Sequence, residues 1–150
     1  MKHSPYKIVR MFEEEIAEYT GSPYAVSIDS CTNALFLVCK YLEVKEVTIP
    51  SQSFHIKKLL PIWKGGMILT DDEDAYNWFK KARYEGRSEK YYKDDDITFH
   101  GWNMYMTPQQ AAHGLSMFQN YPEHMSDLGE DNGYRDLTEF TVFKDFKTIE

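Results

Sequence analysis

Apolar residues near the N-terminus recur every three or four positions, which is the spacing of one face of an α-helix. They are Ile8, Phe12, Ile16 and Tyr19. Ser4 and Pro5 precede them, a hydroxyl suited to capping and a proline suited to the first turn, and Gly21 follows as a stop. The pattern predicts an amphipathic helix over residues 4–21. Packing on its own domain and packing on a second subunit both fit this pattern.

Short apolar runs bounded by turn residues predict strands at residues 24–28, 46–49 and 67–70, with residues 53–56 as a fourth candidate and 140–143 as a short strand near the C-terminus. Three more helical patterns follow the first one. Their predicted buried faces are Leu35, Val38, Cys39 and Leu42 in the second helix, Ala75, Tyr76, Phe79 and Ala82 in the third, and Ala111, Leu115 and Phe118 in the fourth.

The third and fourth helices also carry end signals. Acidic residues 71–74 open the third helix and basic residues including Arg83 close it, in the order that the helix dipole favours, before Gly86 stops it. Thr107, Pro108 and Gln110 open the fourth helix as a capping box. Residues 87–99 show no period and predict a loop.

Composition narrows the class of protein. The 150 residues fit one domain, and a net charge of −7 repels a phosphate backbone, so we do not expect a nucleic-acid partner. Acidic clusters such as residues 13–15 are most simply solvated faces or helix starts. Two cysteines eight positions apart on one helix are outside bridging reach. No apolar run is long enough to cross a bilayer, and we expect a cytoplasmic protein without a membrane anchor.

Two stretches carry candidate chemistry. Residues 28–33 form a strand-turn-helix corner rich in hydroxyls, where backbone N–H groups can receive an anion, although Ser30 and Thr32 also cap helices in proteins without a ligand. Residues 53–58 place His55 and the adjacent Lys57 and Lys58 before Gly65-Gly66. Neighbouring lysines are commonly just solvated charge. The five histidines show no metal-ligand spacing with the cysteines, so no metal site is expected.

Three stretches together resemble the DegT/StrS-type sugar aminotransferases. The sequence Ser-Phe-His-x-x-Lys at 53–58, continued without a gap to residue 72, resembles the segment that binds pyridoxal phosphate as a Schiff base. Residues 11–42 resemble the opening helix and the phosphate-binding turn, and residues 101–112 resemble a Gly-x-Asn-x-Arg-Met segment that enters a helix.

The resemblance implies roles for particular residues. It places Lys58 at the cofactor's lysine, and Ser53, Ser30 and Thr32 at phosphate contacts. His55 and Asn103 are further candidates for binding the cofactor, the latter from a turn that reaches across a dimer interface. The chain departs from the family at Cys31, where glycine is commoner, and at Tyr105, where arginine or asparagine is usual.

The resemblance also implies a gap in the chain. In the family a long segment separates the second strand from the Ser-Phe-His motif, and it carries the aspartate that pairs with the cofactor's pyridine nitrogen. Here residues 51–52 run directly into Ser53. In a second alignment to the family, residues 50–54 match the segment by which the family's chain leaves its second strand. On this second register Lys58 does not match the cofactor's lysine and is an ordinary helix lysine. The implied fold is α/β, a reduced fold-type-I large domain with a mixed sheet of three to four strands flanked by helices.

Two functions follow from these observations. The first is a reduced sugar-nucleotide aminotransferase that holds pyridoxal phosphate on Lys58 in a homodimer, with sugar-nucleotide and glutamate substrates and weak or absent transamination because the pyridine partner is missing. The second is a non-catalytic dimeric interaction module derived from such an enzyme. In both, residues 1–124 form the α/β domain and residues 125–150 an acidic tail.

Overall fold

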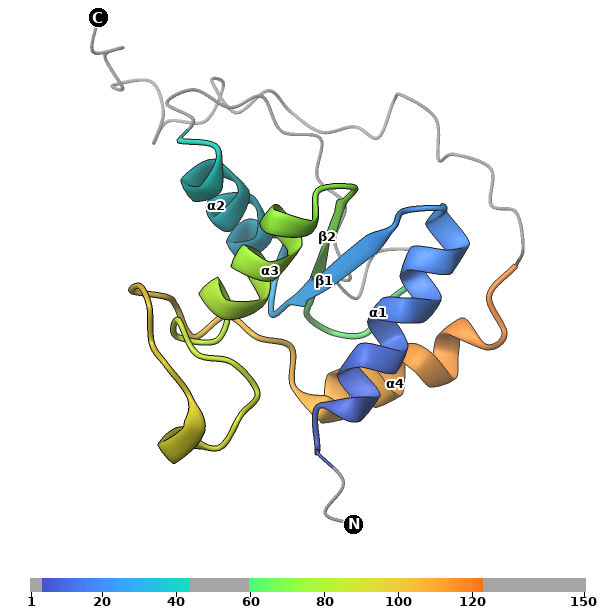
Figure 1. Cartoon of the computed structure of the whole chain (residues 1–150). Coiled ribbons are helices and arrows are strands. Elements are labelled where there is room, and N and C mark those ends of the chain that lie inside the picture. The colour runs from blue at the N-terminus through green and yellow to red at the C-terminus, as the bar shows by residue number, and fades with distance from the viewer. Residues whose placement is uncertain (1–3, 44–59, 123–150) are drawn as a thin grey trace, which may run out of the picture.

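A computed structural model describes residues 4–43 and 60–122 of the chain (Figure 1). The four α-helices of this part are α1 (Lys7–Thr20), α2 (Cys31–Tyr41), α3 (Glu73–Ala82) and α4 (Pro108–Phe118). The two strands are β1 (Tyr24–Ile28) and β2 (Gly66–Thr70), and a short 3-10 helix covers Tyr92–Asp94 in the loop after α3.

The two strands pair antiparallel at the centre of the molecule, with Tyr24 opposite Thr70 and Ile28 opposite Gly66. The predicted strands at 24–28 and 67–70 are therefore confirmed. Those predicted at 46–49, 53–56 and 140–143 lie outside the described residues, as does the expected tail, so the sheet has two strands in the described part of the chain.

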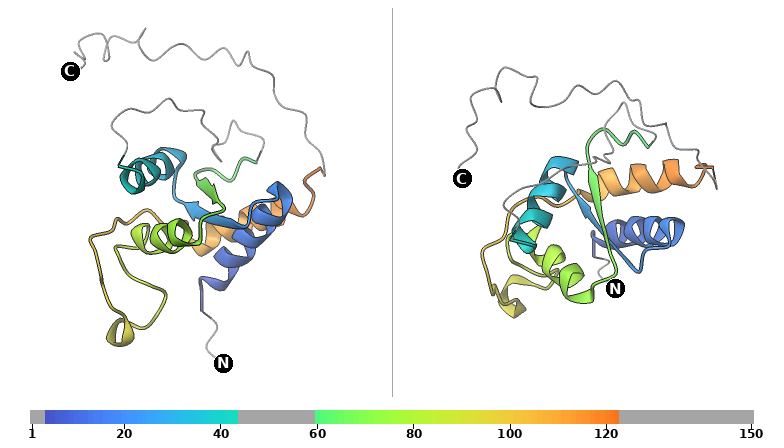
Figure 2. Two further views of the ribbon diagram at one scale, coloured as in Figure 1. Left: turned by 45° about the horizontal axis from the view of Figure 1, so that its top comes forward. Right: turned by 90° about the horizontal axis from the view of Figure 1, so that it is seen from above.

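Helices cover both faces of this small sheet (Figure 2). On one side α2 and α3 pack on side chains such as Val26, Ile28 and Ile68. On the other side α1 and α4 enclose a second cluster, into which Leu60 and Ile62 are also packed. Residues alternate between the faces of a strand, so Ile68 of β2 belongs to the first cluster and the neighbouring Met67 packs against the second. The strand β1 is buried along most of its length. The expected arrangement of a sheet flanked by helices is confirmed.

The first helix begins later than its sequence predicts. Tyr6 occupies the N-cap position without a side-chain cap, and the Ser4 hydroxyl instead accepts the Tyr6 N–H at 3.3 Å, one turn before the helix. Phe12 is buried as predicted, but Tyr19 is 40% exposed and Val9 is buried in addition. The helix packs on β1 and α4 of its own domain, and it ends at Gly21 with φ 72°, as predicted.

In the other helices the predicted capping residues are confirmed more fully than the predicted buried residues. In α2 the buried residues are Ala34 and Leu37, one position away from the predicted stripe, and Leu42 is exposed. In α4 the capping box is present, with the Gln110 N–H donating to the Thr107 hydroxyl and the Thr107 N–H donating to the Gln110 side chain. The α3 prediction was right at its buried positions, since Ala75, Phe79 and Ala82 are all buried.

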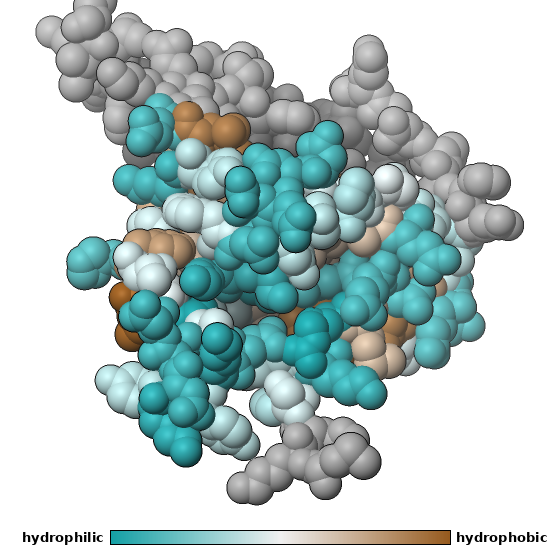
Figure 3. Space-filling view, viewed as in Figure 1, coloured by the Kyte–Doolittle hydropathy of each residue, from teal (hydrophilic) through white to brown (hydrophobic). Residues whose placement is uncertain are grey.

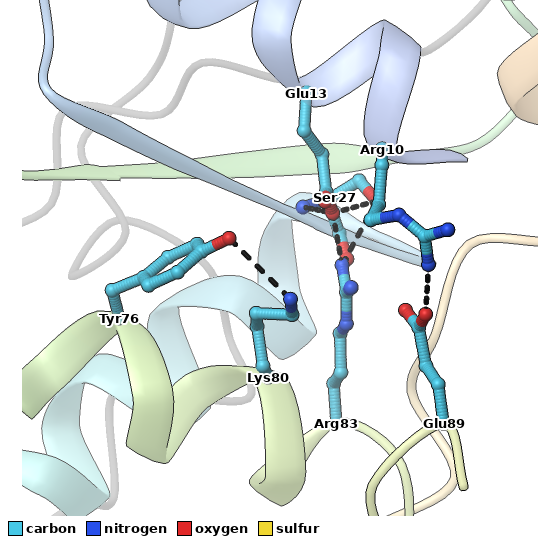
Figure 4. Close-up of polar contacts among 7 residues, drawn as sticks. All are labelled: Arg10, Glu13, Ser27, Tyr76, Lys80, Arg83 and Glu89. Carbon is cyan, nitrogen blue, oxygen red and sulfur yellow. Dashed lines mark hydrogen bonds and ion pairs between the residues drawn. The ribbon is translucent and has the colours of Figure 1, made fainter. Parts of the chain in front are cut away.

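A buried ion pair joins the two helical layers through β1 (Figure 4). Glu13 of α1 and Arg83, which ends α3, are each 4% exposed and bonded to one another. Ser27 lies between them, donating its N–H and its hydroxyl to Glu13 Oε1, both at 2.8 Å, while its carbonyl accepts from Arg83 at 2.6 Å. The interpretation of Glu13 as a solvated charge was therefore wrong. Arg83 does lie at the C-terminal end of α3, as predicted, and its ion pair with Glu13 is additional to that.

No helix in the described ranges is long and apolar enough to cross a membrane. The face of the molecule shown in Figure 3 is mostly hydrophilic, and hydrophobic residues show there only in small separate patches. The structure contains no disulfide between Cys31 and Cys39, as their positions two turns apart on α2 predict.

Candidate functional site

Three of the six residues predicted for the site lie in the described part of the chain. Ser30 and Thr32 are at the start of α2, and Asn103 is in the segment that leads to α4. Ser53, His55 and Lys58 lie outside the described residues.

Ser30 caps helix α2. Its backbone is extended at φ −157° and ψ 156°, and its hydroxyl oxygen accepts the Asn33 N–H at 3.2 Å. The capping interpretation of Ser30 is thus confirmed, and its role in binding a phosphate stays a prediction. Thr32 is exposed in the first turn, and no described residue is bonded to its hydroxyl. The hydroxyl can therefore meet a ligand at the helix end without breaking a bond to any described residue.

Asp29 organises this corner, although the sequence did not single it out as a site residue. Its Oδ1 accepts from the Asn33 amide at 2.7 Å and from the Ser30 hydroxyl at 3.3 Å. Its Oδ2 accepts from the Lys64 amine at 3.2 Å. The position of Asp29 directly before the N-cap residue Ser30 was a local signal for its bonds to Ser30 and Asn33. Lys64 is 35 residues away in sequence, and its bond to Asp29 could be found only in the fold.

The start of β2 lies directly against the start of α2. A Cβ atom placed on Gly66 would lie 2.8 Å from the Cα and N atoms of Cys31 and from the carbonyl carbon of Ser30, closer than real Cβ contacts come. Only glycine allows this approach. Gly66, which with Gly65 follows the predicted lysine segment, is therefore held against the N-terminal end of α2.

The segment before α4 reaches the same corner. The Met104 carbonyl accepts the Asp29 N–H at 2.8 Å, and Tyr105 forms an antiparallel bridge with Ile28. The Gln110 side chain donates to the Lys64 carbonyl at 3.2 Å. All three stretches that carry the resemblance are thus in contact at one end of β1.

Asn103 is not part of this contact network. Its side chain donates to Glu85 Oε1 at 2.8 Å, its backbone pairs with Tyr84, and it is exposed. Within one chain the structure does not bring Asn103 to Ser30 or Thr32. A residue exposed in this way is available to a second subunit, which is the role that the resemblance implies for it.

The corner suits a phosphate group in part. An α-helix start offers N–H groups and a partial positive charge, to which the Thr32 hydroxyl and the Lys64 amine add. The Asp29 carboxylate places a negative charge beside them, and Lys64 offsets it. None of the described residues forms a cluster of His, Cys, Asp or Glu that could hold a metal ion.

Comparisons with known proteins support the resemblance. A model of the DegT/DnrJ/EryC1/StrS aminotransferase family matches residues 2–55 and 46–129. A UDP-4-amino-4,6-dideoxy-N-acetyl-beta-L-altrosamine transaminase of Campylobacter jejuni is 26% identical over 137 residues, which are 91% of this chain and 36% of that protein. The chain therefore spans about a third of the relative's length. The two matched ranges overlap at residues 46–55, where the sequence predicts an internal join.

Proposed function

Because the chain belongs to the DegT/DnrJ/EryC1/StrS aminotransferase family, we propose that it is a reduced sugar-nucleotide aminotransferase that holds pyridoxal phosphate on Lys58. The observation that carries the proposal is the close contact of Gly66 with Ser30 and Cys31. This contact brings the strand that follows the lysine segment to a helix N-terminus suited to phosphate.

The chain's own residues would act as follows. The start of α2 and the hydroxyls of Ser30, Thr32 and Ser53 would bind the phosphate, and His55 would lie beside the ring. Asn103 would come from a partner subunit of a homodimer. The cofactor, when bound, supplies an electron sink for exchange of an amino group. Glutamate and a sugar nucleotide are the proposed substrates, and the matched relative is by name a transaminase of a UDP-sugar.

We propose that transamination is weak or absent even if the cofactor binds. No segment of this chain resembles the one that carries the family's pyridine-binding aspartate. The only carboxylate at the described corner, Asp29, is already bonded to Ser30, Asn33 and Lys64. A hydrogen bond to a charged group contributes about 1.5–3 kcal/mol. Because this one stabilises charge during the reaction, its loss should affect turnover more than binding.

The experiment is to add pyridoxal phosphate, record the visible absorbance, reduce the adduct with borohydride and map the labelled lysine. We expect labelling at Lys58 that disappears in Lys58→Ala and persists in the matched control Lys57→Ala. Equal labelling of the two variants, or labelling spread over surface lysines, would show that the second register is correct and Lys58 an ordinary lysine.

A second candidate is a non-catalytic dimeric interaction module. The observation that favours it is internal to the chain, since residues 51–52 run directly into Ser53 and leave no counterpart of the family's pyridine-binding segment between them. It predicts a dimer by light scattering at concentrations where pyridoxal phosphate leaves no adduct. A monomer without an adduct would exclude both candidates.

A further inference from the structure

The largest cavity of the described residues is a groove of about 590 Å³ between the start of α1, the end of α3 and the loop that follows α3. The predicted site residues Ser30, Thr32 and Asn103 do not line it. The volume lies within the range of about 300–1,000 Å³ that is usual for small-molecule sites, so the groove has room for a few residues of a chain but not for a folded domain. It is a second candidate site, separate from the α2 corner.

The lining of this groove is cationic although the protein has a net charge of −7. Five basic side chains line it, against the single carboxylate of Glu89. Glu89 is paired with Arg10, and the basic residue Arg83 with Glu13 (Figure 4). The four remaining basic residues, which we call the groove cations, are Lys80, Lys81, Arg87 and Lys90.

The groove cations are poorly compensated. No carboxylate of the described residues lies within 4.0 Å of the three lysine amines. The nearest carboxylate oxygen to Arg87 belongs to Glu85, at 3.8 Å, and Asp95, on which the Arg87 charge also acts, is bonded to Ser88. Because clustered like charges repel one another, negative charge placed among the groove cations would be stabilised.

Arg87 holds its charge in a fixed position. Its guanidinium carbon lies 5.1 Å from the ring centroid of Tyr84 and 5.7 Å from that of Tyr92. Tyr84 is itself held by edge-to-face contacts with Tyr6 and Tyr105. The Nε atom of Arg87 is buried while the side chain as a whole is 27% exposed, so a ligand in the groove would meet the terminal N–H groups. These groups match the two oxygens of a carboxylate.

Most of the negative charge of this protein lies in the acidic tail, residues 125–150. The tail has seven acidic and three basic residues, which gives it −4 of the net charge of −7. Three of its carboxylates stand within five positions, at Asp127, Glu130 and Asp131. Acidic residues of the described runs are used elsewhere, since Glu13 binds Arg83 and Asp72 caps α3. The tail is therefore the part of the chain whose charge complements the groove.

The chain enters its acidic tail within reach of the groove. The Tyr19 hydroxyl donates to the Pro122 carbonyl at 3.3 Å, so the last described residue lies at the C-terminal end of α1. The groove lies at the other end of α1, which has 14 residues and is about 21 Å long. The nine residues from 123 to 131 span up to about 30 Å when extended. Residues 127–131 can therefore reach the groove within one chain.

We propose that this groove binds residues 127–131 of the same chain, with the three carboxylates of the segment among the groove cations. The groove cations come from two elements, α3 and the loop that follows it. Carboxylates spaced along a segment can pair with cations on both elements. Docking relieves the repulsion within the groove and the repulsion within the tail together. The proposal does not depend on a cofactor or on the proposed function.

The test is cross-linking of the full chain with a carbodiimide, which joins a carboxylate directly to a neighbouring amine, followed by mass spectrometry. We expect cross-links from the three groove lysines to residues 127–131, with a yield that falls as salt is added. Cross-links spread equally over other carboxylates of the tail, such as Asp136 and Glu139, would contradict the choice of segment. The absence of any cross-link between groove and tail would rule out the docking.

Arg87→Glu should reduce the yield by about threefold or more, since it replaces an attractive charge by a repulsive one and leaves the three reactive lysines in place. Lys40→Glu is the matched control, because it makes the same change of charge on α2, where Lys40 lies over Phe36 and outside the groove. Equal losses in the two variants would show an effect of net charge alone and overturn the site.

A second charge reversal keeps the test valid if Arg87→Glu loses the circular dichroism of the folded protein. Lys81→Glu serves for this, because no described residue is bonded to the Lys81 amine, and the yield is then read at the other two lysines. The same loss of about threefold is expected. An unchanged yield would contradict the proposal.

A tail supplied by a second copy of the chain is distinguished by mixing chains with and without nitrogen-15. Cross-links confined to one chain support the proposal, and cross-links between labelled and unlabelled chains would overturn docking within one chain. Failure here and failure of the proposed function are separate results. Cofactor labelling of Lys58 without cross-links removes only the docking, and cross-links that persist in Lys58→Ala support the docking whether or not the cofactor binds.

Discussion

Replacing Glu13 by glutamine should destabilise the protein far more than a surface substitution does. Glu13 Oε1 accepts from the Ser27 N–H and hydroxyl and from Arg83, and both charged residues are 4% exposed. A glutamine has nearly the same shape and keeps an oxygen for the two Ser27 donors. The change therefore removes mainly the negative charge, and it leaves the Arg83 guanidinium buried with neutral acceptors only.

The magnitude follows from the cost of a buried, unpaired charge. Removing one partner of a buried ion pair costs about 3–5 kcal/mol. We take the lower end, about 3 kcal/mol, because Arg83 keeps the Ser27 carbonyl at 2.6 Å and the Ser27 hydroxyl at 3.0 Å. With a urea m-value of roughly 2 kcal/mol/M, the unfolding midpoint of Glu13→Gln should fall by about 1.5 M.

The assay is urea unfolding followed by circular dichroism and by tryptophan fluorescence. The matched control is Glu14→Gln, since Glu14 is the next residue on α1 and is exposed, and its effect should stay within about 0.5 kcal/mol. Combining Glu13→Gln with Arg83→Met should recover part of the loss, because the unpaired charge is then gone. Equal effects of Glu13→Gln and Glu14→Gln would refute the reasoning, as would a double variant whose losses simply add.

Two further predictions concern the corner and the loop. Gly66→Ala forces β2 away from the backbone of Cys31 and should cost about 1–3 kcal/mol in urea unfolding and reduce cofactor labelling. The matched control is Gly21→Ala, whose added Cβ would meet no atom within 4 Å and would be unfavourable only because the backbone has φ +72°. Gly21→Ala should leave the labelling unchanged. Equal labelling of the two variants would contradict the proposed importance of the Gly66 contact for cofactor binding. The Ser88 hydroxyl, and its N–H after it, lower the pKa of Asp95. The stabilisation that the hydrogen bonds from Ser88 to the Asp95 carboxylate give to the folded loop is therefore fully present above about pH 4, the usual pKa of a free carboxyl. It is lost as pH falls through the lower pKa of Asp95 in the folded protein. The Ser88 amide shift should follow this titration in NMR spectra and lose it in Asp95→Asn; a titration midpoint above pH 4 would contradict the sign.

Local patterns predicted the elements whose causes are local. The strands at 24–28 and 67–70, the buried face of α3 and the Thr107 capping box depend on residues within a few positions of one another. The predicted start of α1 at Ser4 and Pro5 was wrong by two residues, because the Ser4 hydroxyl accepts a hydrogen bond before the helix begins. The predicted face of α2 was wrong by one position, since which side of a short apolar helix is buried depends on the layer it packs against.

Part of the candidate site could be predicted in the same way. The cap at Ser30 and the glycine pair at the start of β2 were visible in the sequence, and the family resemblance linked them. The link between Asp29 and Lys64 was not visible, nor was the placement of Asn103 beside Glu85, because each joins residues from separate segments.

The sequence by itself determined the family of this protein, the order of its described strands and helices, and the residues that cap α2 and α4. Only the tertiary structure decided which charges are buried and which are exposed. Glu13 lies in an acidic run, yet it faces inward at the spacing of Val9 and Ile16 and meets Arg83, 70 residues later. The physical reason is that the energy of a charge depends on its burial and its partner, and both are set by segments far apart in the chain.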